Sequence, residues 1–306
     1  MKILYHHRIR SKDGQFVHID EIVRQLTELG HEVHIVGPAA ATEANIGSES
    51  RSLNLARKLL PRVLYELIEF CYCLVDLFVI SRAIRQFRPD VIYERYNLFL
   101  PSGIWAKRIW RLPLILEVNA PLVEERSAFG GLTLRPLARW SQGYAWRGAD
   151  RIITVTQVLK DVILAYGVDA DRIEVMPNGV DPEEFRFDEA NRALTRSRLG
   201  IDKLFVIGFT GFVRSWHGLE RIVDLLVEPE FRDSGLLIVG DGPAIGSIKA
   251  RAEELDVSSR VIVTGVVERD TVAEHVASFD VAIQPNVVEY ASPLKALEYL
   301  AMGRAI

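Results

Sequence analysis

The segment 292–303 contains residue types that can bind phosphate at the start of a helix. Ser292 is a good N-cap, and Pro293 fits the first helical position, where its missing N–H is no loss. The amides of Leu294 and Lys295 then point out of a helix N-terminus that carries partial positive charge, and the Lys295 ammonium adds a full charge. This arrangement would bind a diphosphate well.

Glu298 lies about one turn further along the same face of this helix as Lys295. At that distance its carboxylate could accept two hydrogen bonds from a ribose diol. The spacing therefore matches a nucleoside diphosphate that lies along the helix start. A capped helix that follows a strand and binds nothing explains the same residues, and it stays open as the alternative.

The elements that must position these residues follow from the alternation of short apolar runs with helical patterns. A strand at 3–5, a helix through Ile19 and Leu26 that Gly30 stops, and a strand at 31–36 form a first βαβ unit. Further strands are expected at 90–93, 114–118, 151–155, 173–176, 204–209, 235–239, 260–263 and 281–283. Such alternation predicts parallel, doubly wound α/β sheets.

The length of 306 residues favours two α/β domains of about 150 residues each. We expect an N-terminal domain at 1–180, a connection at 181–203, where the composition turns charged and loses its apolar period, and a C-terminal domain at 204–306. The chain stops at 302–306, where a helix has ended and an apolar strand is starting. We therefore expect the second domain to be truncated and incomplete.

Composition excludes several classes of protein. With 37 Lys+Arg against 41 Asp+Glu, the formal net charge is -4, which indicates neither a nucleic-acid partner nor an acidic tail. The close pair Cys71 and Cys73 fits a reducing compartment, and no basic and apolar leader precedes the first strand. We expect a cytoplasmic protein.

The stretch 59–80 is the most apolar in the chain, but five residues interrupt it: Pro61, Arg62, Glu66, Glu69 and Asp76. Each charge at bilayer depth costs about 2.5–3.5 kcal/mol, so the stretch is not expected to span a membrane. It predicts an amphipathic helix. Such a helix packs on the first sheet or rests peripherally on the inner face of the membrane, and both readings stay open.

Four segments, taken in order, resemble the retaining glycosyltransferases of family 4, also called glycosyl transferases group 1. They are 13–18, 175–181, 208–218 and 292–303, and the runs 237–243 and 263–265 also look like strand ends of that family. The resemblance covers nearly the whole chain. It implies the GT-B fold, in which two Rossmann-like domains face a cleft, with an acceptor side in the first domain and the donor site in the second.

The resemblance implies a donor site that takes a nucleotide-diphosphate sugar. Gly14 would let the backbone approach the ligand closely, although an ordinary tight loop needs a glycine too. Arg214 and His217 stand at the carboxyl end of a strand, where cations would stabilise the charge that develops on the leaving diphosphate. The implied donor-binding residues are Gly14, Arg214, His217, Thr264, Gly265, Ser292, Leu294, Lys295 and Glu298.

On the acceptor side, the resemblance points to His18, Asn119 and, more weakly, Glu94. Asn119 follows a strand end, where family members often carry a histidine near the reactive carbon of the sugar. The alternatives are a capping or exposed histidine at position 18 and a solvated loop at position 119. The implied acceptor is a saccharide or a lipid-linked saccharide.

The sequence departs from the family pattern at two places. Phe212 and His217 replace the usual arginine and lysine, so Arg214 and His217 are taken as substitutes. Tyr290 stands where many members have the first of two glutamates, with Glu289 one residue early. Either Glu289 reaches the sugar through a local shift, or the sugar is fixed otherwise, or activity is lost.

The resemblance predicts an enzyme, a hexosyltransferase that transfers sugar with retention of anomeric configuration in polysaccharide or glycolipid synthesis. It implies no cofactor, no obligatory metal and no protein nucleophile, with catalytic roles for Asn119, Arg214, His217, Lys295 and Glu298. The alternative is a catalytically weakened homologue that binds nucleotide sugars or acts as a scaffold. An NAD-dependent dehydrogenase is disfavoured because no G-x-G-x-x-G follows the first strand.

Overall fold

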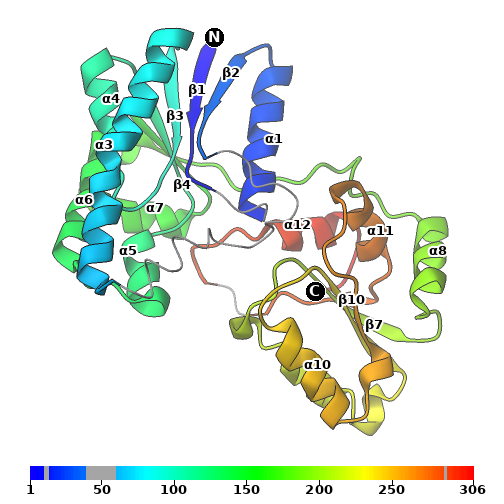
Figure 1. Cartoon of the computed structure of the whole chain (residues 1–306). Coiled ribbons are helices and arrows are strands. Elements are labelled where there is room, and N and C mark those ends of the chain that lie inside the picture. The colour runs from blue at the N-terminus through cyan, green and yellow to red at the C-terminus, as the bar shows by residue number, and fades with distance from the viewer. Residues whose placement is uncertain (10–13, 39–59, 286–287) are drawn as a thin grey trace. The chain divides into compact units, whose positions relative to one another are not determined.

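Contacts divide the chain into two compact units, which Figure 1 shows in colours that run along the sequence. The first unit contains Met1–Pro177 and Glu289–Ser292, and the second contains Asn178–Val288 and Pro293–Ile306. Residues 289–292 thus belong to the first unit, although they follow the strands of the second in the sequence. The computed structural model describes residues 1–9, 14–38, 60–285 and 288–306. Asp13, the first residue of the segment 13–18, and Leu59, the first residue of the apolar stretch 59–80, lie outside these ranges.

The sheet of the first unit consists of parallel strands in the order β2-β1-β3-β4-β5-β6. Their bounds are β1 (Lys2–His6), β2 (Glu32–Val36), β3 (Val91–Arg95), β4 (Leu114–Val118), β5 (Arg151–Thr154) and β6 (Ile173–Val175). Each strand was predicted from its apolar run, with small differences at the ends. Parallel strands are covered on both faces, which is why these runs read as almost continuously apolar.

Helices cover both faces of this sheet (Figure 1). Their bounds are α1 (Gly14–Glu28), α3 (Arg62–Phe87), α4 (Ser102–Trp110), α5 (Leu122–Glu125), α6 (Arg135–Gly148) and α7 (Gln157–Leu164). Successive residues of β1 point to opposite faces: Leu4 packs in the core with α3, α4, α6 and α7, whereas Tyr5 packs with Ile19 of α1. Because β1, β3 and β4 are neighbouring parallel strands, their carboxyl ends meet at one edge of the sheet.

The second unit has a smaller parallel sheet in the order β10-β7-β8-β9. Its elements are β7 (Phe205–Thr210), β8 (Ser234–Val239), β9 (Val261–Val263), β10 (Val281–Ala282), α8 (Glu189–Leu199), α9 (Glu220–Leu225), α10 (Ile245–Glu254), α11 (Val272–Ala277) and α12 (Leu294–Ala301). One core lies under α9 and α10, and the other under α11 and α12. Two parallel, doubly wound sheets confirm the predicted α/β fold class.

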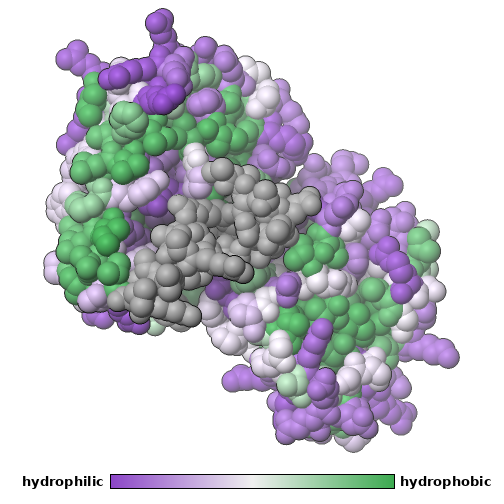
Figure 2. Space-filling view, viewed as in Figure 1, coloured by the Kyte–Doolittle hydropathy of each residue, from purple (hydrophilic) through white to green (hydrophobic). Residues whose placement is uncertain are grey.

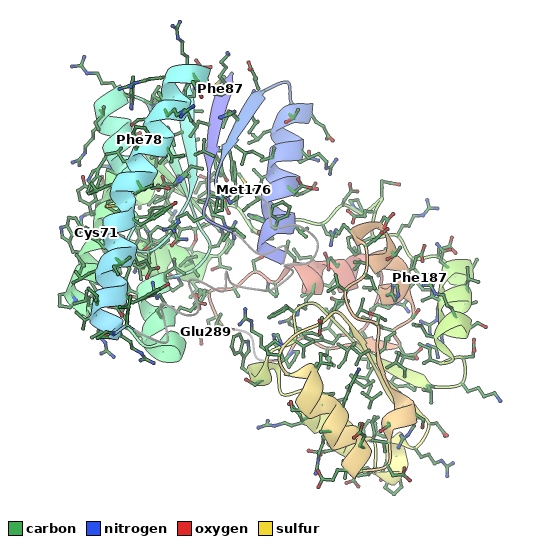
Figure 3. All side chains as sticks on the ribbon, viewed as in Figure 1. Cys71, Phe78, Phe87, Met176, Phe187 and Glu289 are labelled. Atoms are coloured by element: carbon green, nitrogen blue, oxygen red, sulfur yellow. The ribbon has the colours of Figure 1, made fainter. Side chains whose placement is uncertain are left out.

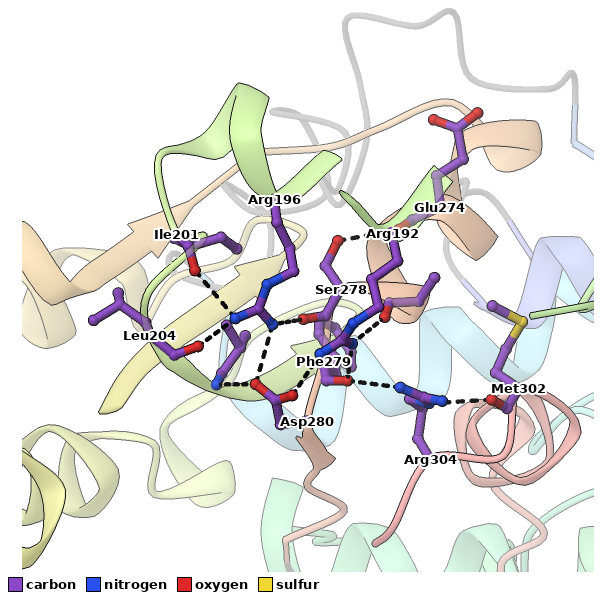
Figure 4. A network of polar contacts seen from close by, with 12 residues as sticks. Arg192, Arg196, Ile201, Leu204, Glu274, Ser278, Phe279, Asp280, Met302 and Arg304 are labelled. Carbon is purple, nitrogen blue, oxygen red and sulfur yellow. Dashed lines mark hydrogen bonds and ion pairs between the residues drawn. The ribbon is translucent and has the colours of Figure 1, made fainter. Parts of the chain in front are cut away.

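Helix α8 is fixed to the second unit by two arginines (Figure 4). Asp188 caps the helix by accepting a hydrogen bond from the Asn191 amide at 3.0 Å. Arg192 and Arg196 donate to Asp280 at 2.5 and 3.0 Å and also to carbonyls of the loop before β10. Burial opposes the charge of Asp280, but these guanidinium groups and a backbone N–H hold the pKa of that carboxyl below its usual value. The segment before β7 is thus an ordered part of the unit.

Helix α3 begins after Pro61 and ends at Arg88, whose φ of 52° is left-handed. The predicted helix is confirmed and extends beyond the predicted end at residue 80. The predicted amphipathic pattern is not found, because Asp76 is buried beside Ile80 while Phe78 is exposed. Ile80 and Ile84 pack in the core of the first unit, so the helix lies on the sheet as one of the two readings expected. Among the described residues, no helix has the length and apolar character needed to cross a membrane.

Candidate functional site

Five polar side chains gather at the carboxyl end of β4 in the first unit, and we call them the β4-end cluster: Tyr5, His18, Arg95, Glu117 and Asn119. Glu117 lies at the centre and is 2% exposed. Its Oε1 accepts hydrogen bonds from His18 Nε2 at 2.9 Å, from Arg95 and from Asn119, and its Oε2 accepts one from the Tyr5 hydroxyl at 3.2 Å. The sequence-predicted His18 and Asn119 are therefore brought together by one buried carboxylate.

The charge of Glu117 is stabilised by its neighbours. Burial favours the neutral acid, but the hydrogen bond from His18 and the charge of Arg95 outweigh it and lower the pKa of Glu117 to about 2. Burial and the nearby carboxylate raise the pKa of the Tyr5 hydroxyl, which stays a neutral donor. His18 remains partly exposed, with its Nε2 fixed and its ring oriented by Glu117.

Glu94, the weaker acceptor-side candidate, lies in a second buried group. His6 donates from Nδ1 to Glu94 at 3.1 Å and from Nε2 to Asp76 at 3.2 Å, and Ser102 donates to Asp76 at 2.5 Å. Burial opposes charge on His6, yet these carboxylates raise the pKa of His6 to about 10. Because Glu94 is 1% exposed, it supports the strand ends from inside and does not line a surface that an acceptor could reach.

In the second unit, Lys295 of α12 lies against the carboxyl end of β7. Its ammonium sits 4.0 Å from the ring centroid of Phe209, a cation–π contact. Gly211, which follows β7, has a φ of 118°, and a Cβ built there would lie only 3.2 Å from Lys295 Nζ. A glycine at 211 therefore gives both the backbone conformation and the space that the lysine side chain occupies.

The Lys295 ammonium is a charge that the second unit does not neutralise. Burial lowers the pKa of Lys295 to about 8, and the charge of Glu298 opposes this shift only in part. Within the described part of the chain, no hydrogen bond or ion pair engages Nζ. A half-buried cation that no described group pairs with, at the carboxyl end of a parallel strand, is placed to bind an anion.

Arg214 and His217 lie close to Lys295 but differ in charge. The Arg214 guanidinium is exposed and stacks over the rings of Phe212 and Trp216 at 4.9 and 5.0 Å. The His217 Nδ1 accepts a hydrogen bond from the Arg214 amide at 3.1 Å. Burial, followed by the charges of Lys295 and Arg214, lowers the pKa of His217 to about 4. This corrects the expectation of a cation at 217: in the free protein the imidazole is neutral and can only donate from Nε2.

Glu298 has a partner that the sequence did not reveal. Its Oε1 accepts a hydrogen bond from Arg269 at 2.8 Å, while the Arg269 Nε pairs with Glu184 at 2.9 Å. The Arg269 guanidinium also lies over the ring of Phe185 at 4.8 Å. Glu298 is 7% exposed. Arg269 fixes its Oε1, and no hydrogen bond from a described residue reaches its Oε2. Arg269 and Glu298 are 29 positions apart in the sequence, so only the folded structure identifies Arg269 as the partner of Glu298.

The start of α12 differs from the predicted capping. The helix begins at Leu294, Pro293 takes the N-cap position with φ −72° and ψ 118°, and no side chain caps the first turn. Ser292 is thus one residue too early to act as the N-cap and belongs to the first unit by its contacts. The amides of Leu294 and Lys295 remain the first of the helix, as expected.

Thr264 and Gly265 follow β9 and lie next to the loop after β8. The Thr264 hydroxyl donates to the Gly265 carbonyl at 2.8 Å, and Gly265 forms a bridge with Gly240. A Cβ on Gly240 would lie 2.2 Å from the Gly211 carbonyl oxygen, so glycine is required where these loops meet. The loops after β7, β8 and β9 are brought together by this close packing. Gly14, the other glycine of the predicted donor site, is the first residue of α1 in the first unit.

Tyr290 stands in the place of the family's first glutamate and is held in the first unit. Its carbonyl accepts a hydrogen bond from the Thr156 hydroxyl at 3.0 Å, and its ring packs against the main core. Burial and the hydrogen-bonded neighbour Glu125 raise the pKa of the Tyr290 hydroxyl to about 12. Glu289, labelled in Figure 3, is exposed. Neither side chain belongs to the unit that holds Lys295.

No group of three or more His, Cys, Asp or Glu side chains that could hold a metal ion occurs in the described ranges. The strand ends of the second unit present cations instead. Lys295 and Arg214, with the neutral donor His217, suit a phosphate or diphosphate group.

Family models match most of the chain. The model of Glycosyltransferase Family 4 matches residues 12–184, and that of Glycosyl transferases group 1 matches residues 205–306.

Among curated proteins, the 2-deoxystreptamine glucosyltransferase of Streptomyces kanamyceticus is 26% identical over 89% of this chain and 75% of its own length. The D-inositol 3-phosphate glycosyltransferase of Acidothermus cellulolyticus is 29% identical over 71% of this chain and 51% of its own length. The chain spans about half the length of several other relatives that it matches.

Solved structures share the fold. The Anabaena protein HepE, solved in complex with UDP-glucose, aligns with a TM-score of 0.74 at 18% identity over 99% of this chain and 79% of its own. Sucrose-phosphate synthase from Thermosynechococcus elongatus also gives a TM-score of 0.74, at 15% identity, over 99% of this chain and 80% of its own.

Proposed function

This chain belongs to glycosyltransferase family 4, and from that membership we propose that it transfers a sugar from a nucleotide-diphosphate sugar to an acceptor hydroxyl, with retention of anomeric configuration. The observation that carries this proposal is the Lys295 ammonium. It lies half-buried at the carboxyl end of β7, has a lowered pKa, and is paired with no carboxylate of the described residues.

The diphosphate of the donor supplies the missing negative charge. Lys295, Arg214 and the first amides of α12 bind its oxygens, and His217 donates from Nε2. Glu298, held by Arg269, accepts hydrogen bonds from the ribose through its remaining oxygen. The UDP-glucose bound by HepE, a protein of similar fold, supports a donor of this class.

In the proposed reaction, the bond between the anomeric carbon and the phosphate oxygen breaks, and the acceptor oxygen bonds to the same face of that carbon. The hydroxyl proton passes to the leaving phosphate oxygen, so no protein nucleophile is needed. The cations near β7 stabilise the charge that develops on the diphosphate. No cofactor or obligatory metal is proposed, and turnover that persists in excess EDTA would support this.

The acceptor is proposed to be a saccharide or a lipid-linked saccharide, with His18 and Asn119 as its contacts on the first unit. Glu117 orients both side chains. We place this activity in glycolipid or polysaccharide synthesis in the cytoplasm; the name of one relative, the alpha-monoglucosyldiacylglycerol synthase of Streptococcus pneumoniae, supports the glycolipid class.

The test is a screen of nucleotide sugars by calorimetry and by release of the nucleoside diphosphate. The Glu298→Ala variant should bind the donor more weakly and lose turnover, and it should unfold at the temperature of the wild type. Wild-type turnover by Glu298→Ala would refute the assigned role. NMR of the product decides between retention and inversion at the anomeric carbon.

A second candidate function is a nucleotide-sugar-binding protein with weakened catalysis. Tyr290 favours it, because its backbone and ring are fixed in the first unit where family members carry a glutamate. Tight binding of a nucleotide sugar with neither transfer nor hydrolysis would support this candidate over the enzyme.

A further inference from the structure

Two hydrogen-bonding atoms at the carboxyl edge of the first sheet have no partner among the described residues. They are Nδ1 of His18, on α1, and Oδ1 of Asn119, after β4, because both side chains bond to Glu117 through their other nitrogen atoms, Nε2 and Nδ2. The His18 side chain is 17% exposed and Asn119 is half-buried, so a ligand at the surface of this unit can reach both. These two atoms decide which ligands suit the β4-end cluster.

Glu117 fixes which end of each side chain meets the protein. An ionised carboxylate only accepts hydrogen bonds, and Glu117 stays ionised because its pKa is lowered to about 2. His18 must therefore carry a proton on Nε2, and Asn119 must turn its amide NH2 group, and not its carbonyl, towards Glu117. In a neutral imidazole, a proton on Nε2 leaves a lone pair on Nδ1. The two atoms that remain for a ligand are thus both acceptors.

Hydroxyl groups suit this pattern, and an anion does not. Neighbouring sugar hydroxyls can donate to His18 Nδ1 and to Asn119 Oδ1, and one of them can accept the second N–H of the Asn119 amide. A carboxylate or phosphate group offers lone pairs only. Placed against the two acceptors, it would lose water without gaining hydrogen bonds, which disfavours its binding.

The charges of the cluster do not compensate an anion either. Arg95 is 8% exposed, and its charge is balanced by Glu117, to which it donates a hydrogen bond. His7, which follows β1, is neutral, because burial, followed by the charges of His6 and Arg95, lowers its pKa to about 4. The β4-end cluster thus contains one carboxylate and one guanidinium, and they pair with each other.

The opposite edge of the same sheet has an ordinary charged surface. Figure 2 shows hydrophilic residues, in purple, along the top of the first unit, where β1 begins in Figure 1. Lys2 at the start of β1 pairs with Glu32 at 3.5 Å, and both side chains are exposed to water. Such charges are screened and remain open to ions, whereas those of the β4-end cluster are buried. The two edges therefore offer a ligand different chemistry.

We propose that the β4-end cluster selects an acceptor whose reacting ring is an uncharged saccharide or polyol with neighbouring hydroxyl groups. A ring that carries a carboxylate or phosphate is rejected. This selectivity rests on the function proposed above, because it takes His18 and Asn119 as contacts of the acceptor. It concerns the ring with the reacting hydroxyl, and a phosphate further along a lipid-linked acceptor does not meet the cluster.

The position of the proton on His18 tests the proposal without enzymatic activity. In protein with isotopically labelled histidine, nitrogen NMR distinguishes a ring nitrogen that carries a proton from one that does not. The His18→Gln variant identifies the signals of His18 by their loss. At a pH of about 8, where an ordinary imidazole is neutral, we expect the proton on Nε2 and the lone pair on Nδ1. A proton on Nδ1 would overturn the proposal, because the site would then present a donor.

Free sugars added to the same labelled protein test the selectivity of binding. The probes are matched pairs: glucose, galactose and mannose, each compared with its uronate, in which a carboxylate replaces the primary alcohol. At least one hexose should shift the Nδ1 signal of His18, and its uronate should bind at least about tenfold more weakly. His34, exposed on β2, is the internal control and should not shift.

Transfer by variants tests the same selectivity during turnover. The nucleotide sugar is held constant, so a preference among acceptors cannot come from the donor. The wild type should show a ratio of kcat/KM, hexose over uronate, of at least about tenfold. His18→Gln keeps one donor for Glu117 and one acceptor for the ligand, so it should retain most of this ratio, whereas His18→Lys, with donors only, should lose it. His34→Lys should leave the ratio unchanged.

The outcomes distinguish this selectivity from the proposed function. If uronates bind and react as well as hexoses, or if His18→Lys keeps the wild-type ratio, the selectivity is wrong and the transferase stands. If no nucleotide sugar supports transfer, the proposed function is wrong, and the proton on His18 and the binding of free sugars still test the cluster. If no hexose shifts the His18 signals, the cluster is not a site for a neutral ring.

Discussion

The strands β4 and β7 each lie between two other strands of a parallel sheet, yet the electrostatics at their carboxyl ends are opposite. At the end of β4, the carboxylate of Glu117 is surrounded by donors and one guanidinium, and its pKa is lowered to about 2. At the end of β7, the ammonium of Lys295 forms no ion pair with a carboxylate of the described residues, and desolvation lowers its pKa to about 8. The first site is completed by the chain itself, and the second is left to be completed by a ligand.

This difference teaches how a structural charge and a binding charge can be told apart. A buried charge that is paired within the fold stabilises the protein and shifts its pKa toward the charged form. A buried charge without a partner costs stability and shifts its pKa toward the neutral form. Removing each should therefore have opposite consequences for folding.

The largest effect is expected from Glu117→Ala. This change leaves the buried guanidinium of Arg95 without its carboxylate and should lower the free energy of unfolding by about 3–5 kcal/mol. The matched change Glu298→Ala removes a carboxylate whose partner, Arg269, is 43% exposed, so its cost should stay below about 1 kcal/mol. Urea denaturation of both variants measures the contrast, and equal losses would contradict it.

The Glu117 carboxylate should also make the free energy of unfolding depend on pH in the acid range. The pKa of Glu117 is about 2 in the folded chain, below the ordinary value of 4.5 for a glutamate. A lowered folded pKa adds stability above the unfolded value, and this contribution is lost as the pH falls from 4.5 toward 2. Unfolding free energy measured across that range should fall less steeply in Glu117→Gln than in the wild type.

Lys295→Met should separate binding from folding. Loss of the ammonium should weaken binding of the cognate nucleoside diphosphate by about 10- to 100-fold, the range for hydrogen bonds to charged groups. The melting temperature should stay the same or rise, because the change removes a half-buried charge that no described carboxylate pairs with. Calorimetry measures the binding and thermal unfolding measures the stability. The control is Lys249→Met, which changes an exposed lysine on α10. A marked loss of stability would show that Lys295 is structural.

Arg269→Gln sharpens the role of Glu298 and should have a smaller effect. If Arg269 positions Glu298 for the ribose, affinity for the nucleoside diphosphate should fall by about two- to fivefold. In the wild type, the 2′-deoxy analogue of the nucleoside diphosphate should bind more weakly than the nucleoside diphosphate itself. This difference in affinity, the 2′-deoxy penalty, should be smaller in the variant, because Arg269 no longer holds the Glu298 carboxylate. Arg269→Lys should restore part of that penalty. An unchanged penalty in Arg269→Gln would mean that Arg269 serves only the fold.

The smallest effect concerns the pH dependence of binding through His217, whose pKa in the free protein is about 4. A bound diphosphate favours imidazolium and raises this pKa. Affinity should then fall modestly, by less than about tenfold per pH unit, as the pH rises from 6 toward 8 and the bound imidazolium loses its proton. His217→Asn should flatten this part of the profile, and an affinity that does not fall in the wild type would rule out a contact between the diphosphate and the imidazolium form of His217.

Much of the fold could be predicted from the sequence, because it rests on local patterns. The apolar runs gave every strand of both sheets, since residues buried on both faces of a parallel sheet read as continuous apolar segments. The position of Lys295 and Glu298 on one helix could also be predicted, since helical spacing places them one turn apart. The predicted Ser292 cap was wrong by one position because Pro293 stands at the helix boundary instead.

The partners of these residues could not be predicted, because they are distant in the sequence. Arg269 reaches Glu298 across 29 positions, and His18 reaches Glu117 across 99. The neutral state of His217 depends on burial and on two nearby cations, neither of which a motif records. The assignment of Tyr290 to the first unit likewise follows from a contact with Thr156, 134 positions away.

The sequence by itself determined the alternation of strands and helices, the helix that carries Lys295 and Glu298, and the resemblance to family 4. These depend on residue type and short spacing. Only the tertiary structure decided which charges are paired, which strand end carries a cation that no described carboxylate pairs with, and which side of α3 faces outward. The physical reason is that burial and charge pairing depend on what surrounds a side chain in space, and the chain brings those neighbours together only when it folds.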